Sequence, residues 1–286
     1  MKWRSLPKVL YLHGDASKNI RDGTAFFDQK SKQIGKAVFG AGTRDVKLLG
    51  KGVHRQYGKG LNGFDVVSNQ FSIHYFFENN VKLNNFLRNV SECCKVGGYF
   101  IGTCYDGKKV FNKLRNKEVN ESIVIMQEAK KMWEIQKNYS QEEFEDDDSC
   151  LGYKISVYQE SINKVFAEYL VNFDYLTRLI ENYGFTPLTI DEAKELGFIS
   201  GIGSFSLLFN KMNIDIKKNS YLKKKYGTAD KLNVNEKKIS FLNNYFIFKK
   251  RRPVNAESVY NSIVKIKTVK VKLKWKKLKK KIILKK

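Results

Sequence analysis

The chain has 286 residues, of which 53 are Lys or Arg and 29 are Asp or Glu, so its formal net charge is +24. Its 42% hydrophobic and 13% aromatic residues are enough to build a packed core, which excludes a wholly disordered or collagen-like chain. Because no stretch approaches the ~20 apolar residues of a membrane-spanning helix and residues 1–10 lack a secretory core, we expect an intracellular protein with no membrane partner.

The predicted elements alternate between strands and helices, which is typical of an α/β sheet. In chain order, strands are expected at residues 8–13, 64–68, 99–104, 155–157, 185–190 and 244–249. Helices are expected at residues 30–39, 81–95, 108–115 and 165–182, with Gly97-Gly98 ending the second of them. The seven glycines of residues 40–63 favour a long loop. Pro253 marks the expected end of the folded body, near residue 252.

The last residues differ from the rest in charge. Residues 264–286 hold 12 lysines and no acidic residue, which is half of the net charge. The lysines alternate with apolar residues, so an extended segment would present one basic face and form an arm that binds nucleic-acid phosphates. A disordered basic extension with little specificity is the alternative. We therefore divide the chain into a folded domain, residues 1–252, and a lysine-rich extension, residues 253–286.

The cysteines predict neither a metal centre nor a disulfide framework. The spacings of Cys93, Cys94, Cys104 and Cys150 fit neither a zinc site nor a secreted disulfide pattern. We therefore expect a reducing compartment and no metal.

Polar and aromatic side chains follow the strand predicted at residues 64–68. Ligands of doubly wound sheets bind outside the carboxyl ends of the strands, and this is where Asn69, Gln70, Phe71, His74 and Tyr75 lie. The aromatic rings are suited to stacking on a base, and Gln70 is suited to hydrogen bonding a polar ligand. Taken one by one, these residues are explained more simply by packing of the turn around a core histidine.

The sequence of this region resembles that of a known family. Residues 64–78 read FDVVSNQFSIHYFFE and resemble the signature of the messenger RNA cap guanine-N7 methyltransferases, in which FD and SxQFxxHYxFE recur. Leu87-Arg88-Asn89 and the GGYFIGT of residues 97–103 are similar to the segments that follow in that family, in the same order and at the same spacing. The resemblance extends weakly over residues 8–250. It implies a Rossmann-like class I methyltransferase fold that uses S-adenosyl-L-methionine.

The resemblance also implies roles for individual residues. Asp15 and Ala16 would contact the adenine of the cofactor, and Gln70 would contact its methionine side. Glu168, in a segment similar to the family's PEFLV, would accept hydrogen bonds from the guanine edge. Phe71, His74 and Tyr75 would line the guanine pocket. Tyr105, which stands where family members often have Pro, and Tyr245 are weaker candidates for it. The implied partner is the capped 5′ end of an RNA, and the implied location is the cytoplasm, nucleus or virion.

The chemistry of the implied reaction needs little beyond positioning. Guanine N7 is already nucleophilic and the sulfonium methyl group is already activated, so no catalytic side chain, metal or covalent nucleophile is required. A carboxylate such as Glu168 would orient the base and favour the positive charge that develops on it, and aromatic faces suit a cationic product. His74 is then a positioning group, because N7 has no proton to lose. The alternative is a purely structural role for both carboxylates, with Glu168 as a surface residue and Asp15 as a helix cap.

Part of the family pattern is not found. The first cofactor motif, an acidic strand with a Gly-x-Gly loop, belongs upstream of Asp15, and Gly40-Ala41-Gly42 is no substitute for it. In the strand order 3-2-1-4-5-7-6 of this fold, strands 1 and 2 are then missing. We expect an incomplete fold, for example from a large-virus capping enzyme whose reading frame is split or truncated. The chain is either a methyltransferase that a second polypeptide complements or an inactive RNA-binding remnant.

Overall fold

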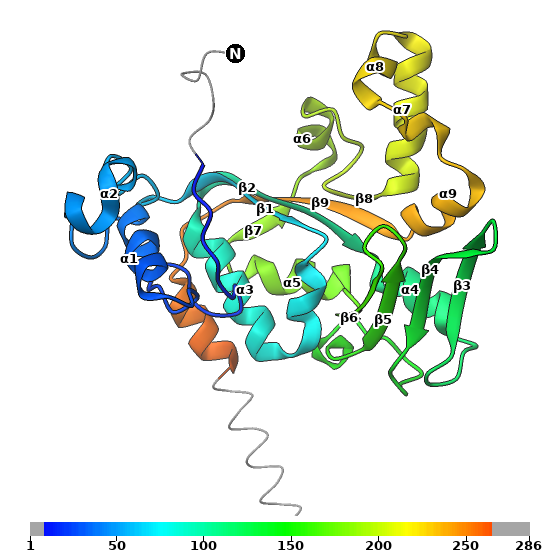
Figure 1. The fold of residues 1–286 in the computed structure, drawn as a ribbon, viewed down its shortest axis with the longest axis horizontal. Coiled ribbons are helices and arrows are strands. Elements are labelled where there is room, and N and C mark those ends of the chain that lie inside the picture. Colours follow the sequence, from blue (N-terminus) through cyan, green and yellow to red (C-terminus); the bar gives the residue numbers. More distant parts are fainter. Residues whose placement is uncertain (1–8, 265–286) are drawn as a thin grey trace, which may run out of the picture.

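The computed structural model describes residues 9–264, which form two sheets flanked by helices (Figure 1). The first sheet has the order β1-β2-β9-β7, with β8 also paired to β9. Its strands are β1 (Phe64–Gln70), β2 (Cys94–Tyr105), β7 (Phe185–Pro187), β8 (Ile202–Ser204) and β9 (Asn243–Lys250). β1 and β2 run parallel and β9 is antiparallel to β2. This matches the 4-5-7-6 part of the expected order, so the Rossmann-like fold class is confirmed. Within residues 9–264, the outer edge of β1 pairs with no strand.

The second sheet is antiparallel and stands beside the carboxyl end of β2 (Figure 1). It consists of β3 (Ser122–Gln127), β4 (Lys130–Lys137), β5 (Lys154–Gln159) and β6 (Lys164–Tyr169). The sequence predicted only β5, and the helix expected at residues 165–182 is confirmed only over its second half, as α5 (Phe173–Glu181). Residues 164–169 form a strand, and the helix begins only after Asn172, whose side chain accepts from the N–H groups of Asp174 and Tyr175.

Within the described residues, two α-helices precede β1 and seven others connect the strands. They are α1 (Gln29–Val38), α2 (Val46–His54), α3 (Asn80–Cys93), α4 (Gly107–Leu114), α5 (Phe173–Glu181), α6 (Ile190–Glu195), α7 (Phe205–Lys218), α8 (Leu222–Tyr226) and α9 (Val234–Ser240), with a further helical segment at residues 256–264. Short 3₁₀ turns occur at η2 (Ile73–Glu78), η3 (Asp148–Cys150) and η4 (Ala229–Lys231). The predictions of α1, α3 and α4 are confirmed. No helix in the described part of the chain is long and apolar enough to cross a membrane.

Several local predictions need correction. Residues 9–13 form no strand, and only an isolated bridge joins Gly14 to Phe26. The expected loop at residues 40–63 contains α2, which Asp45 caps and which bends at Gly50. Gly97-Gly98 does not end α3, because β2 already begins at Cys94. β1 lies where a strand is expected, but most of its side chains are exposed.

The main core fills the space between the first sheet and the helices α3 and α5. Phe77, Leu87, Phe100, Phe246 and Phe248 are completely buried in it. Gly102 permits this packing, because a Cβ atom there would lie 2.2 Å from the Asn69 carbonyl oxygen and 2.3 Å from the ring of Phe246. Adding that atom would force the strands apart.

The folded body continues beyond the boundary expected at residue 252. In the helical segment 256–264, Ala256 is buried in the main core, and Val259 and Ile263 pack against it. The basic arm is predicted at residues 264–286, and residues 265–286 lie outside the described part of the chain. The division of the chain into a folded domain and a lysine-rich extension stays a prediction.

Candidate functional site

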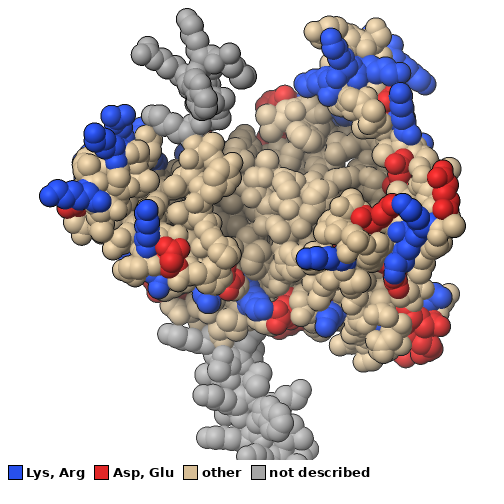
Figure 2. Space-filling view, viewed as in Figure 1, with Lys and Arg blue, Asp and Glu red and all other residues tan. Residues whose placement is uncertain are grey.

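A cavity of about 510 Å³ lies between the carboxyl ends of β1 and β2 and the second sheet. Five predicted residues from three distant segments line it: Phe71, His74, Tyr75, Tyr105 and Glu168. Figure 2 shows a hollow in the middle of the molecular surface, with basic side chains on either side of it. The structure thus brings together most of the residues that the sequence proposed for one pocket.

The turn after β1 presents three of these side chains. Phe71 has a φ of 50°, in the left-handed region, and its N–H donates to the Thr103 carbonyl oxygen at 2.8 Å. η2 then follows, anchored by the completely buried side chains of Ile73 and Phe77. This anchoring turns His74 inward, where it is 6% exposed, while Tyr75 stays at the rim, 42% exposed. The two rings meet edge to face with centroids 4.2 Å apart.

Glu168 is the buried carboxylate of the cavity. It lies on β6, opposite Ile155 of β5, and the alternation of the strand points it inward at 9% exposure. Burial raises the pKa of Glu168 to about 7 and lowers the pKa of His74 to about 4. The Glu168 Oε2 atom lies 3.7 Å from His74 Nδ1, so the two groups face each other without a hydrogen bond. At neutral pH the imidazole is therefore uncharged, and the carboxylate is close to its titration midpoint.

Tyr105 forms part of the cavity wall and contacts residues that the sequence analysis missed. Its hydroxyl accepts hydrogen bonds from Trp133 Nε1 at 3.0 Å and from Gln159 Nε2 at 3.2 Å. Burial raises the pKa of Tyr105 to about 12 although these donors oppose the shift. Trp133 and Gln159 come from β4 and β5, so this contact joins the two sheets across the cavity.

Buried polar atoms in the cavity lack protein partners. Among the described residues, neither ring nitrogen of His74 makes a hydrogen bond, and the Oδ1 atom of Asn243 makes none either. Buried polar groups are nearly always paired in folded proteins, and leaving one unpaired costs roughly 1–3 kcal/mol. A ligand with both donors and acceptors on one edge would satisfy these atoms together with Glu168.

The predicted cofactor residues lie at the end of β1 and on a separate segment near the start of the described chain. Gln70 ends β1, directly before Phe71, and its Oε1 atom accepts from Thr103 Oγ1 at 2.8 Å. Asp15 accepts from the Ser17 N–H at 2.9 Å and the Ser17 hydroxyl at 2.7 Å. Partial burial alone would raise the pKa of Asp15, but the Ser17 hydrogen bonds and the nearby Lys18 lower it. Gln70 is exposed and Asp15 is half-buried, so both keep polar atoms that an external ligand can reach.

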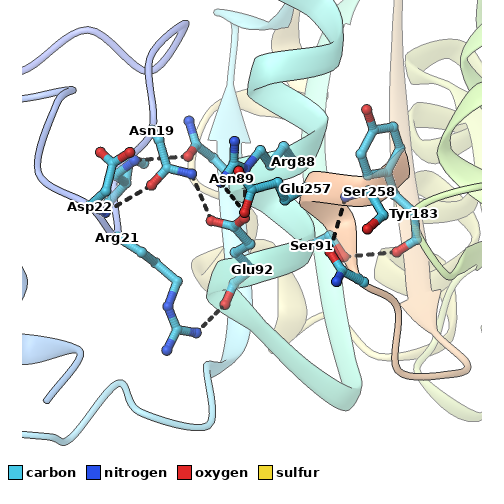
Figure 3. A network of polar contacts seen from close by, with 12 residues as sticks. Asn19, Arg21, Asp22, Arg88, Asn89, Ser91, Glu92, Tyr183, Glu257 and Ser258 are labelled. Atoms are coloured by element: carbon cyan, nitrogen blue, oxygen red, sulfur yellow. Dashed lines mark hydrogen bonds and ion pairs between the residues drawn. The ribbon is translucent and has the colours of Figure 1, made fainter. Parts of the chain in front are cut away.

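A network of polar contacts fixes the segment that carries Asp15 (Figure 3). Asn89 of α3 is 2% exposed; its Nδ2 atom donates to the carbonyl oxygens of Ala16 at 2.9 Å and Lys18 at 2.6 Å, and its Oδ1 accepts from the Ile20 N–H at 2.9 Å. Glu92, one turn later, accepts from Asn19 Nδ2 at 2.8 Å. Asn89 belongs to the LRN segment, so these contacts explain in physical terms why an amide is useful there.

Tyr245 lies outside the cavity, contrary to the sequence-based expectation. Alternation along β9 places Tyr245 and Ile247 on the face that packs against Leu188 and Ala193, opposite to the face of Phe246. The Tyr245 hydroxyl donates to the Ser200 carbonyl oxygen at 3.1 Å. Asn243, the first residue of β9, lines the cavity instead.

Comparison with protein families supplies the assignment. The model of the mRNA (guanine-N(7))-methyltransferase domain matches residues 19–251 of the chain. The chain belongs to this family. The family match includes β1, η2, α3 and β2 as well as the second sheet, so it covers both sides of the cavity.

Individual relatives agree with the family match. The chain is 28% identical over 212 residues to the probable mRNA-capping enzyme of Acanthamoeba polyphaga mimivirus, covering 68% of this chain and 18% of that protein. It is 33% identical over 122 residues to the mRNA cap guanine-N(7) methyltransferase of Saccharomyces cerevisiae, covering 42% of this chain and 28% of that protein. The matches thus span less than a third of either relative. Among solved structures, the CcbJ methyltransferase of Streptomyces caelestis is similar with 10% identity and a TM-score of 0.37, over 68% of this chain and 59% of that one.

Proposed function

We propose that the cavity binds the guanine of an RNA cap and presents its N7 atom to the methyl group of S-adenosylmethionine. The observation that carries this proposal is the buried Glu168 carboxylate, which lies among aromatic rings and buried polar atoms without partners. Guanine presents adjacent N1 and N2 donors, which match one carboxylate. The substrate is the capped 5′ end of an RNA, and the reaction is a step of mRNA capping.

The residues of the cavity suit this reaction without a general base. Transfer of a methyl group to N7 leaves the ring positively charged and releases no proton at N7. The Glu168 carboxylate, hydrogen-bonded to the opposite edge, would stabilise that charge more in the transition state than in the bound substrate. His74, kept neutral by a pKa of about 4, would hydrogen bond the nucleoside rather than accept a proton. Phe71 and Tyr75 at the rim would offer ring faces to the cationic product.

The cofactor would lie next to the guanine, because Gln70 and Phe71 are consecutive residues. When bound, S-adenosylmethionine supplies an activated methyl group. Gln70 would hold its methionine side, and Asp15 and Ala16 its adenine. We propose that strands outside residues 9–264 supply the remaining contacts, from a second polypeptide or from further parts of a longer protein. Those strands would pair with the outer edge of β1.

A second candidate function is binding of capped RNA without methyl transfer. The unpaired outer edge of β1 within the described residues favours it, because that edge is where the rest of the cofactor site is expected. Both functions use the same guanine pocket, and they differ in cofactor binding alone.

The guanine pocket is tested by calorimetric titration of the whole chain with diguanosine triphosphate and with diadenosine triphosphate. Adenine presents an acceptor at N1, so the guanine compound should bind roughly tenfold to a hundredfold more tightly, as expected for charged hydrogen bonds. Glu168→Gln should abolish this preference, whereas Glu195→Gln, on the exposed side of α6, should leave it unchanged. Equal affinity of the wild-type chain for both compounds would contradict the assignment.

The catalytic part is tested in a complex that contains the missing strands and methylates capped RNA. Glu168→Ala should then lower the rate constant of methyl transfer while the variant still folds, because the lost contact strengthens in the transition state. Wild-type turnover by this variant would exclude Glu168 from the reaction.

A further inference from the structure

Positive charge is concentrated in two segments of the described chain. Residues 9–264 contain 38 basic and 29 acidic side chains. Residues 205–240, here called the lysine finger, hold nine lysines and three acidic residues, and residues 30–59 hold eight basic residues and one acidic residue. Both segments are visible as blue surface, the lysine finger over α7 and α8 at the upper right and the other around α1 and α2 at the left (Figure 2).

The acidic residues of the lysine finger are already engaged. Asp215 accepts from Lys211 at 2.7 Å, and Asp230 lies 3.4 Å from Lys223. Glu236 accepts from the Asn233 N–H at 2.7 Å in the capping box of α9. Six exposed lysines form no ion pair with any described residue: Lys217, Lys218, Lys224, Lys225, Lys231 and Lys238. Their charge is therefore available to an external anion.

Only one of the two basic segments forms part of the cavity wall. Ile239 of α9 lines the cavity, and the Phe205 ring at the start of α7 meets the Phe71 ring edge to face at 6.3 Å. Asn235 Nδ2 also donates to the Met126 carbonyl oxygen at 3.2 Å, which ties the lysine finger to the second sheet. The segment of residues 30–59 contributes no lining residue.

We infer that the lysine finger binds the phosphates of the RNA nucleotides that follow the cap. This inference rests on the proposed guanine pocket, from which the RNA chain would leave past Phe71 and Phe205. The 14 residues of α7 rise about 21 Å, so Lys217 and Lys218 at its far end stand beyond the guanine and beside the following nucleotides. Tyr221, 79% exposed between these lysines and those of α8, offers a ring on which a base can stack.

Contacts of this type hold RNA without reading its sequence. Each lysine that neutralises a phosphate releases a condensed counterion, which makes binding weaken as salt rises. The base information would come from Glu168 and its neighbours, and the lysine finger would set the direction in which the RNA runs.

The test uses the whole chain and an uncapped or guanine-capped RNA oligonucleotide, with affinity measured by fluorescence anisotropy at several salt concentrations. One variant combines Lys217→Gln, Lys224→Gln and Lys225→Gln. The matched control combines Lys30→Gln, Lys47→Gln and Lys51→Gln, which removes the same charge from the other basic segment. Residues 265–286 are present in every protein, so their contribution cancels.

In the lysine-finger variant, the negative slope of log affinity against log salt concentration should decrease in magnitude by about 2 for both RNAs. Each of the three lost lysine–phosphate contacts contributes about 0.7 to that slope. The control should change the slope by much less, and neither variant should alter binding of diguanosine triphosphate. An unchanged slope in the lysine-finger variant, or equal changes in both variants, would overturn the inference. A flattened slope in a chain that does not bind diguanosine triphosphate would support the lysine finger and refute the guanine pocket.

Discussion

The guanine pocket and the cofactor side of the first sheet are enclosed to different degrees by residues 9–264. The pocket has walls from both sheets and from α9, and its carboxylate is nearly buried. The cofactor side has Gln70 at the end of β1 and Asp15 on another segment, and within residues 9–264 the outer edge of β1 pairs with no strand. Phe64 and Val66 of that strand are 39% and 48% exposed. Parallel strands are normally covered on both faces, so this side is suited to receive further structure.

In the function proposed above, one domain divides its two ligands between a self-contained site and a shared one. Guanine recognition would depend on side chains that fold together in this chain. Cofactor binding would depend on a surface that further strands extend. The two affinities should therefore respond differently to the same perturbations.

The largest expected difference is between the two ligands themselves. The whole chain, titrated calorimetrically, should bind diguanosine triphosphate but bind S-adenosylmethionine at least a hundredfold more weakly than a complex containing the missing strands. The physical reason is that Asp15, Ala16 and Gln70 satisfy only part of the cofactor, and about 2.7 kcal/mol of lost contacts is a factor of a hundred. Tight one-to-one binding of S-adenosylmethionine by the chain alone would show that its cofactor site is complete.

The next largest effect is that of pH on the guanine pocket. Glu168, with a pKa of about 7, must lose its proton to accept both guanine donors. Affinity for diguanosine triphosphate should therefore rise by up to about tenfold per pH unit from pH 5 to 7 and level off above pH 8. Glu168→Gln should remove this dependence, while Glu195→Gln should retain it. A flat profile in the wild-type chain would mean that the carboxylate is not the guanine acceptor.

The same group predicts a trend in stability. The pKa of Glu168 is raised in the folded state, so the folded chain binds more protons than the unfolded one between the ordinary glutamate value and pH 7. The contribution of Glu168 to the free energy of unfolding should consequently fall as pH rises through that interval and stay constant above it. Denaturant unfolding of the wild-type chain and Glu168→Gln at pH 5 and pH 8 measures it: the variant should gain stability relative to the wild type at the higher pH. An equal difference at both pH values would contradict the raised pKa.

The sequence predicted the central unit of the fold because its signals are local. In β1, α3 and β2 the periodicity and the family resemblance agree, and His74 and Tyr75 follow directly. The hairpin of β3 and β4 was missed because its turn lacks the usual residues. Glu128 and Ala129 adopt φ values of 48° and 63°, conformations that Asn and Gly normally occupy. Trp133 and Gln159 were missed with it, since only the packed structure brings them to Tyr105.

The pocket role of Glu168 was predicted from the family resemblance, because hydrophobic periodicity gives no information about it. Its role came from the resemblance, whereas its helix assignment came from apolar spacing over residues 165–182 and was wrong. The strand explains its burial better, because alternation along β6 turns one side chain in two toward the cavity. Tyr245 shows the converse: the resemblance suggested the pocket, and the alternation of β9 placed the ring on the other face.

A smaller effect is expected from Asn89, which holds the cofactor side in place. Asn89→Ala leaves the Ile20 N–H and the carbonyl oxygens of Ala16 and Lys18 without their partner, at a cost of about 2 kcal/mol in unfolding free energy. Hydrogen exchange of the Ile20 amide should accelerate, while affinity for diguanosine triphosphate should stay the same. Asn112→Ala, on the exposed side of α4, should change stability by less than about 0.5 kcal/mol. An unchanged exchange rate at Ile20 would show that the segment is fixed by other contacts.

The smallest effect concerns Tyr105 and decides whether its hydroxyl touches guanine. That hydroxyl already accepts from Trp133 and Gln159, so its main role is to join the two sheets across the pocket. Tyr105→Phe should cost about 1 kcal/mol in unfolding free energy and weaken binding of diguanosine triphosphate only a few-fold, because the ring that forms the wall remains. Tyr158→Phe, which removes a hydroxyl bonded to Asn163 at the edge of the second sheet, should leave that affinity unchanged. A loss of more than about tenfold in Tyr105→Phe would mean that the hydroxyl also hydrogen bonds the base, since a direct contact to the ligand adds its own free energy to that of the wall.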